Sequence, residues 1–341
     1  MTQTREIRLK ARPDGPATRD NFDMITRTLP PPKAGELLVR VIWLSLDPYM
    51  RGRMDAGKSY AAPVEIGEVM TAQAVGEVVQ SNHDRFVHGD VVMGPFGWAD
   101  HAISDGTGVV KVPAGAPIST ALGVLGMPGM TAWTGLTEIA KAKPGETVVV
   151  SAATGAVGAT AGQLAKARGM RVVGVAGGAE KCAFAVDELG YDSCLDHRSL
   201  DRKSLAAGIR DAAPDGVDVY FENVGGKTLS ATLGNMNDFG RIAVCGMIAW
   251  YSGQNLDEAA PLPLVWRSIL TRKLSVQGFI VTDHFDRWGA FYREVAPMVM
   301  DGRITMREDV TNGIENAPDA FFRMLEGRNF GKTLVRVGPD P

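Results

Sequence analysis

The stretch from Val148 to Gly162, VVVSAATGAVGATAG, decides the fold of this chain. Its apolar beginning predicts a buried strand, and the small and apolar residues of Gly155–Arg168 predict a helix. Between them stands Ala153-x-Gly155-x-x-Gly158, a GxGxxG motif with alanine in the first place. In such a unit the glycines let the backbone approach a pyrophosphate, and the N–H groups of the helix start face it. We therefore predict dinucleotide binding, with a plain tight turn as the alternative.

The end of the next strand indicates which dinucleotide is bound. Arg171–Ala176 predicts a second strand, and an NAD enzyme would carry Asp or Glu about 20 residues past the glycine loop. This chain has Gly177-Gly178 there, followed by Lys181 and Arg198. Cations without a carboxylate favour a 2′-phosphate. We predict NADP(H), although both side chains also fit ordinary surface charges.

Strands and helices alternate from about Met127 onward. A helix is expected at Thr131–Lys141 and another at Glu180–Leu189, since apolar residues recur there near a spacing of 3.6. Alternation of this kind indicates a parallel sheet with right-handed crossovers. The further strands expected are Val217–Phe221, Arg241–Cys245 and Leu274–Val281.

The first 120 residues show short β-type runs separated by Gly and Pro, which predicts a β-rich unit. The tail adds a short amphipathic helix at Pro318–Glu326 and a strand at Gly331–Val337. We predict an α/β fold in which a Rossmann-type doubly wound domain, residues 126–301, is inserted in a β-rich domain of residues 1–125 and 302–341. The runs in the first part are Glu36–Trp43, Val75–Val79, Asp90–Met93 and Gly108–Val112.

Composition excludes several classes of protein. The 341 residues carry a net charge of −3 and no basic run, so nothing favours nucleic acid or an anionic membrane as partner. No run approaches the roughly 18 apolar residues of a membrane helix, and we expect a cytoplasmic protein. The three cysteines form no CxxC pair and none precedes Cys182, so neither a disulfide framework nor a zinc site is expected. Without a GxSxG elbow, the chemistry falls to the nicotinamide.

Several longer sequence motifs indicate a known family. They include SLDPYMRGRM from Ser45, GMPGMTAWTGL from Gly126, VDVYFENVGG from Val217 and GRNFGKTLV from Gly327. With them it resembles the zinc-independent medium-chain dehydrogenase/reductases, in the branch of leukotriene B4 dehydrogenase/prostaglandin reductase, plant alkenal double-bond reductases and bacterial NADPH-dependent curcumin reductase. The resemblance implies a GroES-like catalytic domain, NADP(H), a small α,β-unsaturated carbonyl substrate and a homodimer. Hydride would reach the β-carbon of the substrate without zinc, because Ala72 and Gln73 stand where zinc-bearing relatives have a His-Glu pair.

The resemblance also implies which residues contact the cofactor. Positions in the glycine loop would lie against the pyrophosphate, and Lys181, His197 and Arg198 would meet the 2′-phosphate. Others would line the nicotinamide and its ribose. The complete set is Met127, Thr131, Gly155, Ala156, Val157, Gly158, Gly178, Lys181, His197, Arg198, Asn223, Cys245, Gly246, Met247, Ile248, Tyr251, Phe279, Ile280, Val281 and Asn329.

Three tyrosines are the candidate catalytic residues. Tyr49, Tyr60 and Tyr251 would supply hydroxyls to the substrate, since charge builds on its carbonyl oxygen during hydride transfer. A partly buried aromatic ring is the alternative for each. Relatives carry a further tyrosine where this chain has Thr271. A quinone reductase and a non-catalytic NADPH-binding protein remain the alternative functions.

Overall fold

The computed structural model describes residues 1–253, 256 and 259–341. The chain forms two compact units. The first consists of Met1–Leu122 together with Glu308–Pro341, and the second of Gly123–Arg307. The sequence places the borders of the inserted domain at residues 126 and 301, a few residues inside the second unit. In the described residues, no helix has the length and apolar character needed to span a bilayer.

The second unit is built on a six-stranded sheet in the order β10-β9-β8-β11-β12-β13. All neighbouring strands run parallel. The strand order reverses between β8 and β11, which is the switch point of a doubly wound sheet. The Rossmann-type fold expected from the sequence is confirmed. The strands are β8 Thr147–Ser151, β9 Arg171–Ala176, β10 Ser193–Asp196, β11 Val217–Glu222, β12 Met236–Val244 and β13 Ser275–Gly278.

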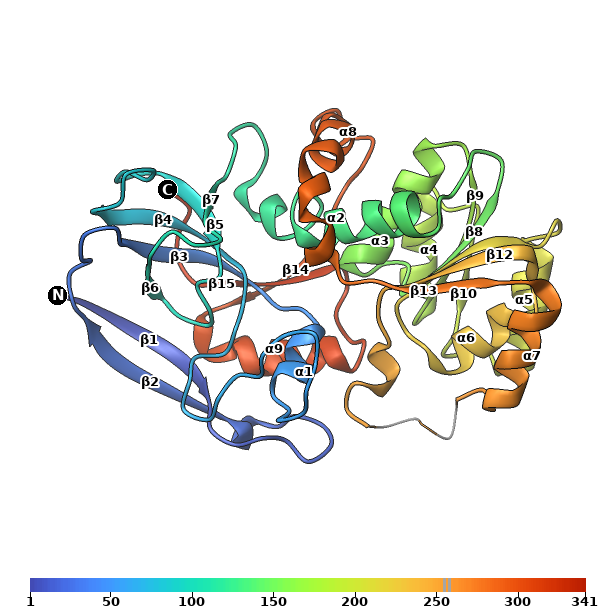
Figure 1. Ribbon diagram of the computed structural model, residues 1–341, viewed down its shortest axis with the longest axis horizontal. Coiled ribbons are helices and arrows are strands. Elements are labelled where there is room, and N and C mark those ends of the chain that lie inside the picture. Colours follow the sequence, from blue (N-terminus) through green and yellow to red (C-terminus); the bar gives the residue numbers. More distant parts are fainter. Residues whose placement is uncertain (254–255, 257–258) are drawn as a thin grey trace. The chain divides into compact units, whose positions relative to one another are not determined.

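Helices cover both faces of this sheet (Figure 1). On one face, α5 and α6 bury apolar side chains against Val149, Tyr220 and Ile242 of the strands, and α7 packs partly buried side chains on the same cluster. On the other face α3 packs on β8 and β9, and α2 packs on α3. The helices are α2 Met127–Thr134, α3 Ala156–Ala167, α4 Ala179–Asp187, α5 Arg202–Ala212, α6 Gly226–Leu233, α7 Leu262–Arg272 and α8 Trp288–Met300.

Two elements of this unit differ from the sequence expectation. The helix expected at Thr131–Lys141 begins at Met127, and its last part, Gly135–Ile139, is a π-helical turn. Gly135 lets this turn approach the sheet, because a Cβ there would lie 2.4 Å from the Phe221 ring. The strand expected at Leu274–Val281 is only Ser275–Gly278, since its partner β12 ends at Val244 opposite Gly278. A 3₁₀ helix, Val281–Arg287, follows.

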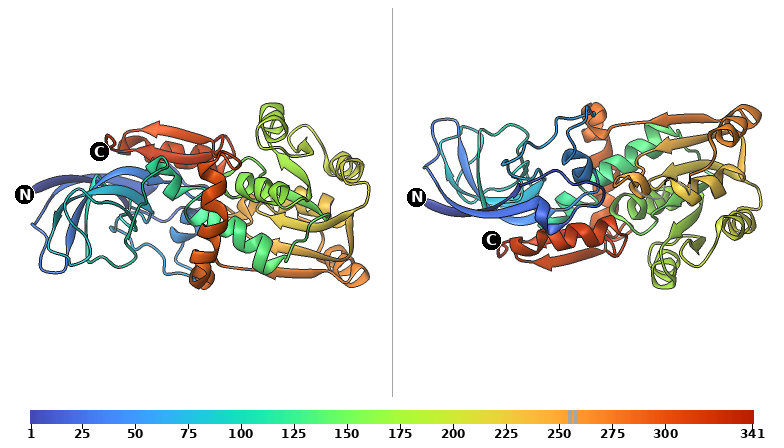
Figure 2. Two further views of the ribbon diagram at one scale, coloured as in Figure 1. Left: turned by 90° about the horizontal axis from the view of Figure 1, so that it is seen from above. Right: turned by 90° about the horizontal axis from the view of Figure 1, so that it is seen from below.

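The first unit holds a seven-stranded sheet, mostly antiparallel, in the order β14-β15-β3-β4-β5-β7, with β6 paired to β3. β15 pairs with β3, so the last part of the chain completes the sheet begun by the first part (Figure 2). The strands of this sheet are β3 Leu37–Ser45, β4 Ala74–Ser81, β5 Val91–Gly94, β6 His101–Ser104, β7 Val110–Lys111, β14 Glu308–Asn312 and β15 Lys332–Arg336. A separate antiparallel pair is formed by β1 Thr2–Leu9 and β2 Phe22–Leu29. The helices of the unit are α1 Tyr49–Arg53 and α9 Ala317–Leu325.

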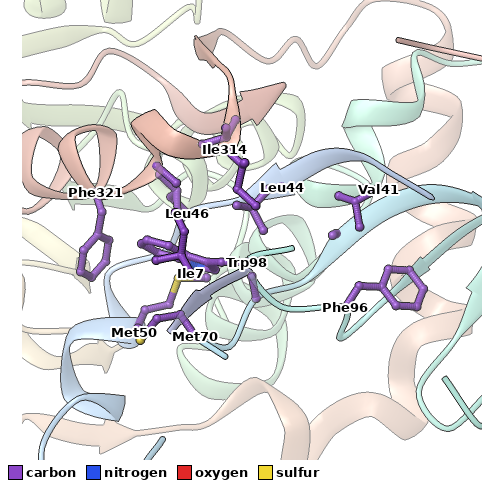
Figure 3. Packing of buried hydrophobic residues seen from close by; sticks show 14 of the residues in the cluster. Ile7, Val41, Leu44, Leu46, Met50, Met70, Phe96, Trp98, Ile314 and Phe321 are labelled. Atoms are coloured by element: carbon purple, nitrogen blue, oxygen red, sulfur yellow. The ribbon is translucent and has the colours of Figure 1, made fainter. Parts of the chain in front are cut away.

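Trp98 is the centre of the core of this unit (Figure 3). Its indole is fully buried, stacks on Phe22 at 5.6 Å and meets Phe321 of α9 edge-on at 5.6 Å. Ile7 of β1 and Met50 of α1 belong to the same cluster. Aromatic pairs of this geometry contribute about 0.5–1.5 kcal/mol beyond the area they bury. This core fixes α1, which carries Tyr49, and α9 to one sheet.

Candidate functional site

The glycine loop joins β8 to α3 in the second unit. Gly155 is the N-cap of α3 with extended backbone, and Ala159 N–H makes a helical hydrogen bond to its carbonyl at 2.8 Å. Gly158 must be glycine, because a Cβ there would lie 2.2 Å from the Ala152 carbonyl oxygen. The first N–H groups of a helix have no helical partner and attract anions. The loop therefore presents the backbone of Ala156, Val157 and Gly158 in the form that a pyrophosphate needs.

Tyr191, which was not among the predicted residues, supports this loop by hydrogen bonds to its backbone. Its buried hydroxyl donates to the Gly158 carbonyl (2.8 Å) and lies 3.2 Å from the Ala153 carbonyl. Gly162 leaves space for the ring, since a Cβ there would come within 2.0 Å of it. Burial raises the pKa of the Tyr191 phenol well above its ordinary value, so the hydroxyl stays a donor. No local motif points to this contact, because Tyr191 lies far along the chain from the loop.

Positive charge gathers where β9 and β10 end. We call Lys181, His197, Arg198 and Lys227 the basic cluster. Gly177 makes room for two of them: a Cβ there would lie 2.9 Å from Arg198 Nε and 3.0 Å from His197 Nε2. Burial first, then Lys227 and Arg198, lower the pKa of His197.

A phosphate fits the basic cluster better than a ribose diol. The nearby acid, Asp196, points its Oδ1 at the backbone N–H groups of Gly178 and Arg198, each at 2.8 Å. A carboxylate held in this way does not reach out as the ribose-binding Asp or Glu of an NAD site would. Mutually repelling cations are stabilised by a dianion. The residues present therefore fit the adenosine 2′-phosphate of NADP(H).

Glu222 and Asn223 join the ends of β8 and β11 at the switch point. Glu222 is 1% exposed, and its Oε1 accepts from Ser151 Oγ (2.9 Å), Val224 N (2.6 Å) and Gly225 N (3.0 Å). Burial raises the pKa of this carboxyl. Asn223 Nδ2 donates to the Ser151 carbonyl at 2.8 Å. Ligands of open α/β sheets bind at this edge, so these contacts fix the backbone there.

The segment after β12 folds back on this edge. The backbone N–H groups of Cys245 and Gly246 donate to the Glu222 carbonyl at 2.8 and 3.1 Å. Tyr251 turns its ring over the same segment, and its hydroxyl accepts from Met247 N at 3.2 Å. Burial raises the pKa of the Cys245 thiol to about 12, so this cysteine is a neutral apolar group. Ile248 begins a 3₁₀ turn, Ile248–Trp250, between them.

The remaining predicted positions of the second unit lie in α2 and after β13. Thr131 Oγ1 donates to the Met127 carbonyl at 2.7 Å, one turn back in α2. The Phe279 ring is close enough to Gly135 that a Cβ there would lie 3.1 Å from it. Ile280 and Val281 are half-buried. Thr271, in the last turn of α7, donates its hydroxyl to the Arg267 carbonyl at 2.8 Å.

In the first unit, Tyr49 begins α1 and Tyr60 lies in the loop after it. Burial, then the Asp47 charge and Tyr60, raise the pKa of Tyr49. Tyr60 is 59% exposed, and partial desolvation raises its pKa while the Arg53 charge opposes the rise. Both phenols therefore keep their protons and can donate. The two predicted residues lie close enough that the Tyr60 phenol raises the pKa of Tyr49.

Arg53, at the end of α1, belongs to the same neighbourhood and was not predicted. Its Nε and Nη1 are buried and have no hydrogen-bond partner within the described ranges. A buried donor without a partner costs about 1–3 kcal/mol, more when charged. The sequence could not single out Arg53, because it is the second arginine of DPYMRGR and no local pattern distinguishes it from the first. The first, Arg51, bonds to Asp55 (2.7 Å) and to the Gly15 carbonyl (2.6 Å).

A buried lysine holds the turn that leads into Tyr49. Lys332 is 1% exposed, and its Nζ donates to Ser45 Oγ (2.7 Å), the Leu46 carbonyl (3.0 Å) and Asp47 Oδ1 (2.7 Å). Ser45 Oγ also bonds to Asp47. All three protons of the ammonium are thus used. Asn329, three residues before the lysine, donates from Nδ2 to the Gly331 carbonyl (3.0 Å) and to Thr333 Oγ1 (3.1 Å).

Metal-ligating side chains do not gather in the part of the chain that the structure describes: no three His, Cys, Asp or Glu lie where they could hold an ion. Ala72 is fully buried and offers no ligand atom. The Gln73 carbonyl accepts from Ser45 N at 3.0 Å, as part of the sheet edge.

Comparison with known proteins identifies the family. Residues 5–112 match the family described as the N-terminal domain of oxidoreductase, and residues 156–297 match the zinc-binding dehydrogenase family. NADPH-dependent curcumin reductase of Escherichia coli (strain K12) is 46% identical over 97% of this chain and 96% of its own. The chain belongs to the medium-chain dehydrogenase/reductases.

Its relatives within this family include prostaglandin reductase 1 of Mus musculus, 41% identical over 99% of this chain and all of that protein. Among solved structures, CurA from Vibrio vulnificus in complex with NADPH has a TM-score of 0.92 and 44% identity, with 98% of this chain and 100% of that one covered. The branch of the medium-chain dehydrogenase/reductases that the sequence predicted is confirmed, as is the fold class.

Proposed function

We propose that this medium-chain dehydrogenase/reductase is an NADPH-dependent reductase of carbon–carbon double bonds conjugated to a carbonyl. The observation that carries the proposal is the basic cluster at the ends of β9 and β10, in a chain alike over its whole length to reductases named for NADPH. Similarity to curcumin reductase, prostaglandin reductase 1 and the 2-alkenal reductase of Nicotiana tabacum supports enones and enals as substrates.

NADPH would be held by the second unit. The loop backbone at Gly155–Gly158 suits the pyrophosphate, and the basic cluster suits the 2′-phosphate. When bound, NADPH supplies a hydride from its nicotinamide. The residues proposed to lie along the nicotinamide half are those that end β11 and follow β12 and β13. They are Asn223, Cys245–Tyr251 and Phe279–Val281, with Met127 and Thr131 of α2. The cofactor contact expected of Asn329, which belongs to the first unit, stays a prediction.

The substrate oxygen would be held by Tyr49 and Tyr60. Both hydroxyls keep their protons, because burial raises the pKa of Tyr49 and desolvation that of Tyr60. A protonated phenol donates to an oxygen that becomes negative as the β-carbon accepts hydride. Arg53 adds a positive charge in the same neighbourhood, with unsatisfied donors. The Tyr251 hydroxyl accepts from the Met247 backbone N–H, which positions the segment after β12, and its own proton can be donated to the substrate oxygen or the ribose.

The test is a coupled measurement of binding and turnover with purified protein. We expect loss of NADPH absorbance with enones and enals, weaker activity with NADH, and none without a substrate. Turnover of phenyl-ring quinones with no turnover of aliphatic enones would instead identify a quinone reductase. NADPH binding without turnover of any acceptor would identify a non-catalytic NADPH-binding protein. Tyr49→Phe, which removes one hydroxyl, should lower kcat without changing the affinity for NADPH.

We also propose a homodimer formed through the β13 edge of the sheet. β13 is last in the strand order, and all four of its residues are exposed. Beside it, α7 buries none of its residues, and Trp266 and Leu270 are 60% and 78% exposed. An unpaired strand edge beside exposed apolar side chains is normally covered. Sedimentation at twice the chain mass is expected, and Leu270→Lys should shift it to the monomer. A cytoplasmic location stays a prediction.

A further inference from the structure

One oxygen of a buried carboxyl group joins two neighbouring strand ends of the second unit. Glu222 ends β11, and its Oε1 accepts from Ser151 Oγ, at the end of the parallel strand β8, at 2.9 Å. The same oxygen accepts from the backbone N–H groups of Val224 and Gly225, at 2.6 and 3.0 Å. We call residues 223–225, which lead from β11 into α6, the switch-point turn. Glu222 therefore fixes this turn to the end of the neighbouring strand.

The switch-point turn holds the segment after β12 by backbone hydrogen bonds and packing. Its first two carbonyls accept from Ile248 N and Ala249 N, at 3.2 and 3.1 Å. Gly225 has a φ of +82° and leaves room for the Trp250 ring, because a Cβ at Gly225 would lie 2.8 Å from that ring. A shift of the Glu222 carboxyl group would therefore also move the 3₁₀ turn that follows β12.

The Glu222 side chain acts on these segments only through its hydrogen bonds to the chain. It is 1% exposed, so it cannot touch a substrate. Its second oxygen, Oε2, has no hydrogen-bond partner among the residues that the structure describes. The hold on the switch-point turn thus rests on the three hydrogen bonds at Oε1.

This inference rests on the function proposed above, in which the nicotinamide half of NADPH lies along Asn223 and residues 245–251. These residues belong to the switch-point turn and to the segment that it holds. The phosphates are assigned to the glycine loop after β8 and to the basic cluster, most of which follows β9 and β10. Lys227, at the start of α6, has its own anchor, since its Nζ donates to the Leu200 carbonyl at 3.2 Å. The contacts of Glu222 therefore affect the reacting end of NADPH more than its phosphates.

We propose that Glu222 is a positioning residue, which holds the switch-point turn and the segment after β12 in the arrangement that hydride transfer from NADPH requires. Hydride transfer depends steeply on the placement of the reacting groups, and a misplacement of about 1 Å can lower the rate about 100-fold. Affinity for a charged nucleotide depends strongly on the contacts to its phosphates. Glu222 therefore determines the rate of hydride transfer more than the affinity for NADPH.

The first experiment measures the rate of hydride transfer in a single turnover with an enone, together with the dissociation constant of NADPH. Glu222→Met removes the acceptor and should lower the rate by about 10- to 100-fold, with a much smaller change in the dissociation constant. Glu222→Gln keeps an acceptor oxygen for the three donors and should stay close to the wild-type rate. An equal loss of rate in both variants, or an equal loss of rate and affinity in Glu222→Met, would overturn the proposal.

The matched control is Glu146, at the opposite edge of the same sheet. Its carboxylate accepts from Arg241 of β12 and from Lys143 N, so Glu146→Met also removes an acceptor that links two segments. It should lower the free energy of unfolding and leave the rate of hydride transfer unchanged. A loss of rate as large as that in Glu222→Met would indicate a general loosening of the sheet and overturn the proposal.

A milder variant serves if Glu222→Met does not fold. Ser151→Ala removes one of the three donors to Oε1, together with the acceptor of the hydrogen bond from Asn223 N (2.8 Å). It keeps the two backbone hydrogen bonds to Glu222, so the rate of hydride transfer should fall by a smaller factor. An unchanged rate in Ser151→Ala would contradict the positioning role.

The second experiment needs no turnover. At saturation, the fluorescence of bound NADPH reports the surroundings of the nicotinamide, and it should change in Glu222→Met but not in Glu222→Gln or Glu146→Met. Without nucleotide, hydrogen exchange at the Val224 and Gly225 amides should be faster in Glu222→Met alone. Wild-type fluorescence and exchange in Glu222→Met would refute the proposal. If the wild-type protein binds NADPH but reduces no enone, the proposed function fails, whereas the fluorescence still decides the positioning role.

Discussion

Lys332 in the first unit and the basic cluster in the second both carry positive charge, but their surroundings differ. Lys332 is buried among acceptors of the chain, whereas the basic cluster is partly exposed. Lys332 has three acceptors, one of them the Asp47 carboxylate, and is closed off from water. In the basic cluster the nearest acid, Asp196, is committed to backbone N–H groups. The cations of the basic cluster stand close together at a partly exposed edge of the sheet, where a dianion would stabilise them. The difference separates a structural lysine from a binding site.

The largest effect, on the free energy of unfolding, is expected from removing the Lys332 ammonium. Lys332→Met removes the cation and leaves Asp47 and Ser45 buried without it, so the free energy of unfolding should fall by about 3–5 kcal/mol. Urea denaturation measures the change. The control is Arg19→Met, which breaks the exposed Arg19–Asp319 pair and should cost less than about 1 kcal/mol. Equal losses in the two variants would show that Lys332 is not structural.

The next effect concerns the basic cluster. Lys181→Met should weaken NADPH binding by about 10- to 100-fold, the worth of one charged hydrogen bond, and should leave NADH binding unchanged. Titration with each nucleotide at fixed salt gives the two dissociation constants. Lys203→Met, an exposed lysine on α5, is the matched control and should change neither. Equal weakening for NADPH and NADH would contradict recognition of the 2′-phosphate.

A smaller effect tests the support beneath the glycine loop. Tyr191→Phe removes the hydroxyl that donates to the Gly158 carbonyl and should lower the free energy of unfolding by about 0.5–1.5 kcal/mol. Binding of both NADPH and NADH should weaken, because the pyrophosphate loop serves both. Tyr292→Phe, whose ring meets Phe291 in α8, is the control and should leave binding intact. An effect on NADPH alone would be inconsistent with a role at the pyrophosphate.

The smallest effect is a pH dependence at His197. Burial, Lys227, Arg198 and Lys181 lower its pKa, and Asp196 opposes them. The folded protein therefore favours the neutral imidazole. The free energy of unfolding should not change with this group above pH about 6.5, its ordinary pKa, and should fall as the pH drops below that value.

A bound phosphate raises the same pKa, so NADPH should bind more tightly at pH 6 than at pH 8, by less than about tenfold. His197→Gln should reduce this pH difference to that of the phosphate itself. An unchanged difference in the variant would exclude His197 from the site.

The local patterns predicted most of the second unit. Gly155, Gly158 and the strand before them are close in sequence, so the loop and its helix follow from a short stretch. Errors arose where a partner set the boundary: β13 ends at Gly278 because β12 ends, and Gly135 allows a π turn against Phe221. β1 and β2 were missed because their pairing, Thr2 with Leu29 through Leu9 with Phe22, joins distant residues.

By itself the sequence determined the Rossmann-type topology, the insertion of one domain in another and the nucleotide class, because glycine spacing, apolar periodicity and the charge after a strand act over a few residues. Only the tertiary structure decided that Tyr191 supports the glycine loop and that Arg53 keeps unsatisfied donors beside two phenols. These contacts depend on which elements become neighbours when the sheet assembles. Hydrogen bonding and packing fix that arrangement across the fold, and no short pattern encodes it.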